Sequence, residues 1–215
     1  SYHDAALDVC DQAQVAYRRL SPEGKNYRRL VEAAETGEHD FLALGAVGLG
    51  VIPGSVIGTV CERVVRRSAI DTLVIRDPER AIGDGPLVVA LDGSQRAFGA
   101  LMTAFKLSRH LGAPVHAVAA YDPYFHYIAF DKISAGLSEE AGQEFRFKDQ
   151  EQLHEEIIDA GIAKIYQSHL DVAQTIAKEA GVALTCELLE GKPYHVISQY
   201  LERAGASLLL LGKTG

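Results

Sequence analysis

The sequence FLALGAVG, Phe41–Gly48, decides the fold together with Gly58-Thr59, which follows after nine further residues. The apolar run Phe41–Leu44 predicts a buried strand. Gly45 and Gly48 then predict a loop with positive φ angles that a ligand can approach closely. Beyond the loop, apolar residues recur at helical spacing as far as Val65, so the stretch reads as strand, glycine-rich loop and helix.

Gly58-Thr59 stands early in the helical stretch, where free N–H groups and the helix dipole suit a phosphate group. The hydroxyl of Thr59 adds a donor for a phosphate oxygen. No lysine follows this second glycine, so the loop is not a P-loop, and its spacing is not GxGxxG either. Glycines after a strand are equally typical of a simple tight turn, so the loop alone leaves both interpretations open.

An internal repeat extends the pattern to the second half of the chain. Residues 1–48 align without a gap with residues 168–215, at an offset of 167. The aligned pairs include EGKNY at 23–27 with EGKPY at 190–194, and Gly45 and Gly48 with Gly212 and Gly215. We interpret this as a tandem duplication. By the same offset some elements of each copy fall outside the sequence, so we expect a chain that is cut at both ends.

Strands and helices are expected to alternate along the chain. The continuous apolar run Leu87–Leu91 predicts a strand covered on both faces, and Asp92-Gly93-Ser94 predicts a turn with a helix N-cap. The other expected helices are 3–13, 24–34, 94–111, 165–180 and 193–204, and the other expected strands are 15–20, 71–76, 115–120, 182–189 and 207–211. This alternation predicts an α/β fold with a doubly wound parallel sheet.

Residues 121–165 depart from the alternation. They begin with the aromatic loop Tyr121–Tyr127 and continue as a polar helical region, roughly residues 137–165. We expect this segment to be a helical insert, and the sequence leaves its purpose open.

The spacing Gly-x2-Gly-x9-Gly-Thr is followed by an arginine-bearing helix, the strand Thr72–Arg76 and, beyond a linker, the strand-turn sequence Leu87–Ser94. This arrangement resembles the universal stress protein family. The resemblance implies Rossmann-like, HUP-type domains in tandem, the first within residues 1–80 and the second within 86–215, with the insert at 121–165. It also implies a cytoplasmic regulatory protein of the stress response that binds ATP, AMP or ADP and is usually a dimer or a pseudo-dimer of its own domains. Mg²⁺ is a candidate companion of the phosphates.

Candidate site residues follow from the resemblance and from the edge of the sheet where α/β proteins bind ligands. Asp92 is the counterpart of the family's nucleoside contact, although it could also serve only to cap a helix together with Ser94. Ala120, at the end of a strand, is expected to border the base. The remaining candidates would hold the phosphates, with Lys213 as a further contact: Gly45, Gly48, Gly58, Thr59, Gly212 and Gly215.

Bulk properties narrow the function further. A net charge of −8 argues against nucleic acid as a general partner, and no apolar run is long enough to span a membrane. The three cysteines form no CxxC pair, and His126, His154 and His169 match no metal-ligand spacing, so we expect no metal site and assign these histidines to loops or the surface.

No catalytic constellation is legible, so we expect binding with at most slow ATP hydrolysis and name no catalytic residue. Two alternatives remain at this stage. One is an assembly or scaffold module with a vestigial nucleotide loop, and the other is a related adenylating enzyme.

Overall fold

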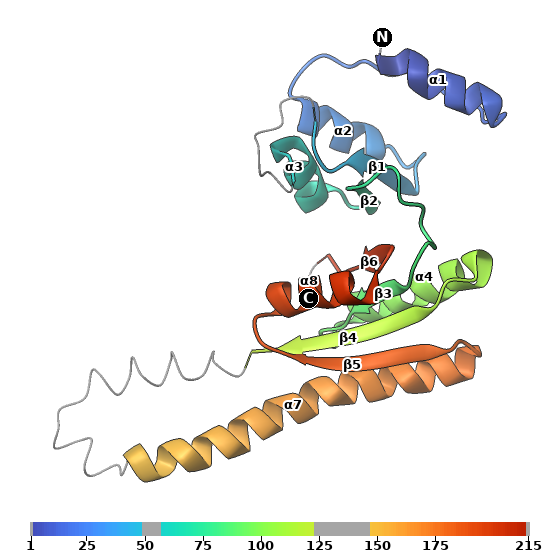
Figure 1. Cartoon of the computed structure of the whole chain (residues 1–215). Helices are drawn as coiled ribbons and strands as arrows, with labels where there is room; N and C mark the ends of the chain where they lie inside the picture. The colour runs from blue at the N-terminus through green and yellow to red at the C-terminus, as the bar shows by residue number, and fades with distance from the viewer. Residues whose placement is uncertain (1, 49–56, 123–146, 214–215) are drawn as a thin grey trace. The chain divides into compact units, whose positions relative to one another are not determined.

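The computed structural model of the chain describes residues 2–48, 57–122 and 147–213. The chain divides into two compact units, Ser1–Pro78 and Glu79–Gly215, which are treated one at a time below. Figure 1 labels their helices and strands.

The second unit is built on a four-stranded parallel sheet with the order β5-β4-β3-β6. Its strands are β3 (Leu87–Ala90), β4 (Val115–Tyr121), β5 (Leu184–Glu190) and β6 (Leu208–Leu210). Leu87 pairs with Val115 of β4 on one side and with Leu208 of β6 on the other. The chain moves outward from β3 through β4 to β5 and then returns to the far side of β3. The prediction of a parallel α/β sheet is confirmed, and its strand order reverses at β3.

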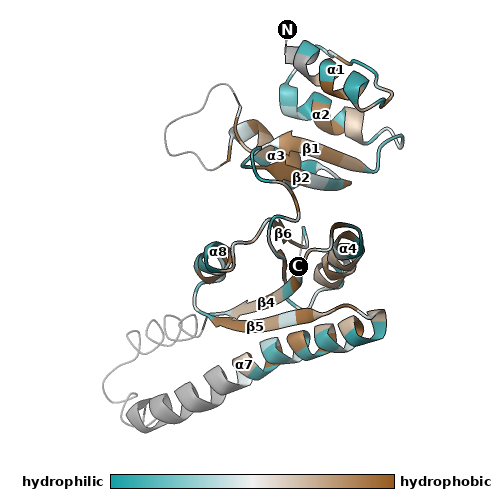
Figure 2. Ribbon diagram, turned by 45° about the vertical axis from the view of Figure 1, so that its right-hand side comes forward, coloured by the Kyte–Doolittle hydropathy of each residue, from teal (hydrophilic) through white to brown (hydrophobic). Residues whose placement is uncertain are grey.

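Helices cover both faces of this sheet. On one face α4 (Gln95–Leu111) and α7 (Phe147–Ala180) share a core with the strands, and on the other face α8 (Pro193–Ala204) packs on a second core. Figure 2 shows the strands mostly in the hydrophobic colour and the helices with polar outer faces. β4 is therefore mostly buried, as its largely apolar sequence requires, and His116 and Tyr121 are its only partly exposed residues.

Local signals in the sequence explain where α4 begins and ends. The Ser94 hydroxyl accepts a hydrogen bond of 3.2 Å from the N–H of Ala97, which caps the helix as predicted. Gly112 ends the helix with a left-handed φ of 69°. Between these ends Leu101 and Phe105 are 0% and 1% exposed, and they fix the helix on the sheet.

The sequence interpretation of α7 was wrong in one respect. It expected a separate helix to begin at Ile165, whereas the structure has one continuous helix from Phe147 to Ala180. No proline interrupts this stretch, and Gly161 alone does not break the helix. The predicted inward residues Leu170, Ala173 and Ala177 are buried. The aromatic loop beyond Asp122 and the start of the expected insert lie outside the described residues.

The first unit contains α1 (Tyr2–Gln12), α2 (Asn26–Ala34), β1 (Phe41–Gly45), α3 (Thr59–Arg67) and β2 (Asp71–Ile75). β1 pairs with β2 in parallel, and α2 packs against α3 around Val64, which is 0% exposed. The strand–loop–helix prediction for Phe41–Arg67 agrees with β1 and α3, and the loop residues 49–56 lie outside the described part of the chain.

The strand expected at residues 15–20 is absent from the structure. Val15 and Leu20 are 57% and 49% exposed there, and no described strand is hydrogen-bonded to this segment. The aligned segment in the second unit forms β5, whose seven residues all pair with β4. A strand needs such a partner for its backbone groups, so a favourable local sequence is not sufficient.

Two pairs of aligned positions have similar backbone conformations. Gln14 and its aligned residue Gly181 both adopt left-handed conformations, with φ angles of 54° and 65°. Gly24 and its counterpart Gly191 have φ angles of 132° and 125°. Both pairs stand at the same offset of 167 that the sequence alignment uses, so the two segments turn in the same way.

The linker, from Arg80 to Gly85, is hydrogen-bonded to the rest of the second unit. The Ser207 hydroxyl donates to the Gly85 carbonyl at 2.8 Å and accepts from the Gly83 N–H at 3.1 Å. The Arg80 guanidinium donates to the Gly205 carbonyl. Because of these bonds the linker residues from Glu79 onward belong to the second unit. The boundary between the units therefore lies between Pro78 and Glu79 rather than at Gly83 or Gly85.

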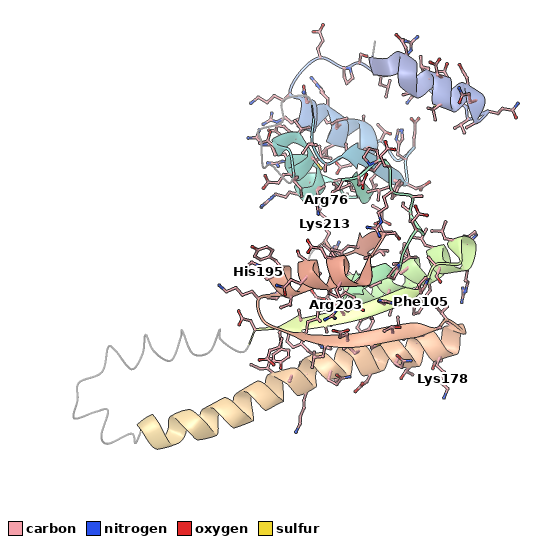
Figure 3. All side chains as sticks on the ribbon, viewed as in Figure 1. Arg76, Phe105, Lys178, His195, Arg203 and Lys213 are labelled. Carbon is pink, nitrogen blue, oxygen red and sulfur yellow. The ribbon has the colours of Figure 1, made fainter. Side chains whose placement is uncertain are left out.

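A polar network joins α8 to β4 and β5, and Figure 3 labels its Arg203. The Tyr200 hydroxyl lies 2.9 Å from Nδ1 of His116, and Arg203 donates to Glu187 while its guanidinium carbon lies 5.1 Å from the Tyr200 ring centroid. Burial lowers the pKa of His116, although the charge of Glu187 opposes this.

We predict that Phe105→Ala lowers the free energy of unfolding by about 3–5 kcal/mol, because the ring is fully buried in the α4–α7 core and its loss leaves a cavity. Urea denaturation monitored by circular dichroism measures this. Met102→Ala, one turn away and 43% exposed, is the matched control and should cost well under half as much.

We also predict that acid destabilises the second unit through His116. Because its native pKa is lowered, the unfolded chain binds the proton more readily. The stabilising contribution is complete above about pH 6.5, the ordinary histidine value, and is lost as the pH falls from there through the native pKa. His116→Gln should flatten the dependence of unfolding free energy on pH in this range, and an unchanged slope would contradict the assignment.

Candidate functional site

The carboxyl ends of β3, β4 and β6 lie along one edge of the sheet, because the three strands are parallel neighbours. The strand order reverses between β3 and β6, and α/β proteins bind ligands at such a point. Asp92 follows β3 and Gly212 follows β6, so the structure brings these two predicted residues to the same edge.

Asp92 lies in an exposed turn that is stabilised by its own hydrogen bonds. Its carboxylate oxygen Oδ1 accepts a 2.9 Å hydrogen bond from the Ser94 N–H. Hydrogen bonding from the Ser94 side chain and backbone, helped by the nearby His169, lowers the pKa of the Asp92 carboxyl. Ser94 caps α4, so Asp92 is not needed as the helix cap, and its ionised carboxylate can accept hydrogen bonds from a ligand hydroxyl.

Gly212 lies directly against the first turn of α4. A Cβ atom at this position would stand 3.0 Å from the Ala97 nitrogen and 3.1 Å from the Arg96 carbonyl carbon. A side chain here would therefore push β6 and α4 apart, so glycine is required for close approach. Lys213 follows immediately, and Gly215 lies outside the described residues.

Ala120 does not contribute its side chain to this edge. It is 7% exposed and belongs to the core under α8, together with Val118 and Leu189. Only its backbone could border a ligand. The next residue, Tyr121, ends β4 and donates from its hydroxyl to the Glu190 carboxylate of β5 at 3.1 Å.

His169 is the residue that sequence reasoning missed. It was assigned to the surface or a loop, but it is half-buried on α7 and its ring fills the space against Gly93, where no Cβ would fit. Its Nδ1 atom is buried without a hydrogen-bond partner in the part of the chain that the structure describes. The ring of Tyr166 lies 5.6 Å away in an edge-to-face arrangement, and Tyr121 lies 6.2 Å from Tyr166.

The sequence did carry a signal for this cluster. Tyr166 and His169 have the i, i+3 spacing of one helix face, next to the apolar stripe that begins at Leu170. The sequence did not reveal that Gly93 lies against this helix face, because Gly93 is far from His169 along the chain. In the structure Gly93 has a φ of 83°. The second unit therefore presents a carboxylate, a glycine contact and an imidazole–tyrosine cluster along the same end of the fold.

The first unit brings its predicted glycines together as well. The Gly58 N–H donates to the Ala46 carbonyl at 2.7 Å, and a Cβ at Gly58 would lie 3.7 Å from the Gly48 nitrogen. Thr59 is the first residue of α3. The expectation of positive φ angles was wrong for Gly45 and Gly48, because Gly45 is part of β1 and neither residue is left-handed. Among the residues that the structure describes, no atom lies within 4 Å of the position that a Cβ at Gly48 would take.

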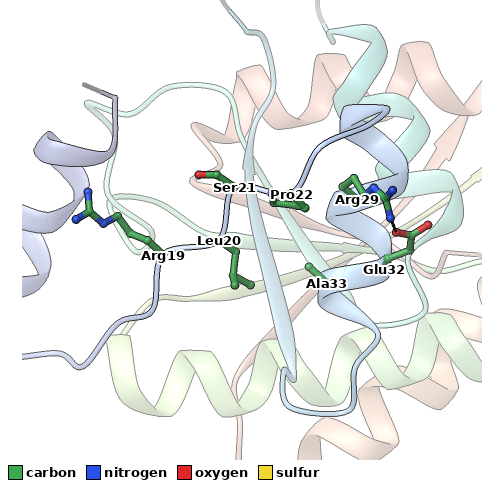
Figure 4. Close-up of a pocket in the computed structure, with 7 residues that line it drawn as sticks. All are labelled: Arg19, Leu20, Ser21, Pro22, Arg29, Glu32 and Ala33. Atoms are coloured by element: carbon green, nitrogen blue, oxygen red, sulfur yellow. Dashed lines mark hydrogen bonds and ion pairs between the residues drawn. The ribbon is translucent and has the colours of Figure 1, made fainter.

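A separate pocket of about 500 Å³ lies in the first unit between residues 19–22 and α2 (Figure 4). Its Arg29 pairs with Glu32 at 2.7 Å and donates to the Glu23 carbonyl. None of the predicted site residues lines it, so the candidate site is the glycine-lined sheet edge instead.

Among the described residues, no three metal-ligating side chains come together. None of the helices in these ranges is both long and apolar enough to cross a membrane. Cys10, Cys61 and Cys186 are free thiols.

Comparisons with known proteins now bear on this geometry. The model of the Universal stress protein family matches residues 85–215. No curated protein matches the sequence significantly.

Solved structures are also similar to the chain, and the first of them shows the same fold. A universal stress protein from Archaeoglobus fulgidus matches with a TM-score of 0.58 and 17% identity, over 96% of this chain and 64% of its own length. A protein of the same family from Burkholderia pseudomallei matches with a TM-score of 0.42 and 24% identity, over 60% of this chain and 80% of its own. A universal stress protein in complex with cAMP matches with a TM-score of 0.39 and 19% identity, over 59% of this chain and 74% of its own length.

We predict that Gly93→Ala and His169→Ala are strongly coupled. Gly93→Ala alone should cost more than about 2 kcal/mol, because a left-handed alanine is strained and its methyl group meets the imidazole ring. In a His169→Ala background the collision is relieved, so at least about 1 kcal/mol should be recovered. Chemical denaturation of the four proteins measures the cycle.

Gly99→Ala is the matched control for this cycle. Gly99 lies in α4 with nothing within 4 Å of its missing Cβ, so alanine should be neutral or stabilising by up to about 1 kcal/mol. Simple additivity of Gly93→Ala and His169→Ala would contradict the proposed contact.

Proposed function

Because the chain belongs to the universal stress protein family, we propose that it binds an adenine nucleotide, ATP or its products ADP and AMP, and acts as a regulatory protein of the stress response. We place the nucleotide at the carboxyl edges of the parallel strands, once in the second unit and once at the glycine loop of the first.

The contact between Gly212 and the first turn of α4 is the observation that carries this proposal. It joins the loops after β3 and β6 at the point where the strand order reverses, with the ionised Asp92 beside them. In this proposal Asp92 accepts hydrogen bonds from the ribose hydroxyls. The backbone at Ala120 borders the base, and Gly212, Lys213 and Gly215 approach the phosphates.

In the first unit Gly45, Gly48 and Gly58 surround the phosphates, and Thr59 offers its hydroxyl. The start of α3 supports this arrangement, since its free N–H groups and the helix dipole favour an anion and the charge of Glu62 in this turn is paired with Arg66. Mg²⁺ would accompany a bound triphosphate. The repeat in the sequence and the matching φ angles support the proposal of two tandem domains.

We propose binding with at most slow hydrolysis. Asp92 already accepts from Ser94 and is held ionised, which suits a ligand contact better than a general base. We also propose that the protein is cytoplasmic and that it either pairs its two domains or forms a homo-oligomer. Sedimentation velocity measures the oligomeric state.

We predict that Gly48→Val and Asp92→Ala each weaken ATP binding about tenfold or more at their own site, which corresponds to about 1.4 kcal/mol. The valine would place a branched side chain where the phosphates are proposed to approach the loop, and the alanine would remove the hydrogen-bond acceptor. Isothermal titration calorimetry of the protein with ATP and Mg²⁺ measures both effects.

Gly99→Val is the control, because it adds the same side chain within α4, where no described atom lies within 4 Å of the missing Cβ. Binding by both variants with the affinity of the parent protein would refute the proposed site. A parent protein that binds no nucleotide would instead support the assembly module with a vestigial loop.

A further inference from the structure

Three arginines converge on one tyrosine ring in the first unit. The guanidinium carbons of Arg67, Arg63 and Arg28 lie 5.1, 5.3 and 6.0 Å from the centroid of the Tyr27 ring. Arg28 and Tyr27 come from the first turn of α2, whereas Arg63 and Arg67 come from α3. Packing of the two helices therefore creates the Tyr27 cluster, defined as Tyr27, Arg28, Arg63 and Arg67.

The charges of this cluster are not compensated by carboxylates. Other arginines of the same helices are paired, Arg29 with Glu32 at 2.7 Å and Arg66 with Glu62 at 2.9 Å. Arg28, Arg63 and Arg67 form no ion pair with a carboxylate in the described ranges of the chain. Their side chains are exposed, in a protein whose net charge is −8. Positive charge is thus concentrated at one place on an acidic molecule.

The tyrosine keeps these charges in place. A guanidinium near an aromatic ring is attracted by the π-system and can still use its N–H groups to bind an anion. The Tyr27 oxygen accepts from Nε of Arg28 at 3.2 Å, which leaves the phenol O–H as a donor. Hydrogen bonding from Arg28, together with the positive charges of Arg28, Lys25 and Arg67, lowers the pKa of Tyr27.

We propose that the Tyr27 cluster is a binding site for a small anion that carries linked phosphate groups, of which pyrophosphate is the simplest. A guanidinium group can bind two phosphate oxygens at once. Three guanidinium groups around one ring therefore suit an anion with several negative charges better than a ligand with a single carboxylate. Arg63 and Arg67 stand four and eight residues beyond Thr59, about one and two helical turns from the glycine loop, so this site does not depend on the proposed nucleotide site.

Titration of the protein with inorganic pyrophosphate, followed by calorimetry in the absence of Mg²⁺, tests the proposal. Arg63→Ala and Arg67→Ala should each weaken binding about tenfold, because each removes a charge-assisted pair of hydrogen bonds. Arg66→Ala is the matched control. It removes the same charge from the same helix, but Arg66 is paired with Glu62, so the change should stay within about twofold.

Several outcomes would overturn the proposal: no binding of pyrophosphate, an equal loss for Arg66→Ala, or loss of pyrophosphate binding in Gly48→Val, which would move the anion to the glycine loop. Thermal unfolding of each variant checks that these exposed substitutions leave the fold intact. Absence of ATP binding with pyrophosphate binding retained would reject the nucleotide proposal and leave the Tyr27 cluster standing. Loss of pyrophosphate binding in Arg63→Ala and Arg67→Ala, with ATP binding unchanged, is the expected result.

Discussion

The hydrogen-bonded position of β3 between β4 and β6 is the constraint on which the second unit depends. It makes β3 the most protected strand, with Leu87, Val88 and Val89 all 0% exposed. It also reverses the strand order at one point, so that the loops after β3 and β6 meet at the first turn of α4. The same pairing that stabilises the core therefore forms the edge at which we propose that a nucleotide binds.

The contact between Gly93 and His169 extends this edge to α7. Because the imidazole ring fills the space that a side chain at position 93 would need, the Asp92 turn rests directly on a helix of 34 residues. A buried nitrogen without a partner is costly, and such groups in folded proteins are often relieved by water or a ligand. His169 thus links the shape of the Asp92 turn to the position of α7.

Charge is distributed unevenly over the chain. For the binding of a ligand this local distribution matters more than the net charge of the protein. The overall excess of acidic residues makes nucleic acid an unfavourable general partner. Around Tyr27, however, the packing of α2 on α3 brings Arg28 of α2 together with Arg63 and Arg67 of α3. A net charge describes the long-range field of a protein, whereas binding depends on the charges within a few ångströms of the ligand.

The sequence by itself determined the elements whose signals are local. Helical spacing predicted the buried face of α4, and Ser94 marked its cap. Only the tertiary structure decided that Ala120 points into the core, that residues 15–20 form no strand, and that His169 supports Gly93. Each of these depends on a partner distant in the sequence, either a neighbouring strand or the approach of a helix. Periodicity reports which face of an element is apolar, but the neighbour on that face is chosen by the packing of the whole chain.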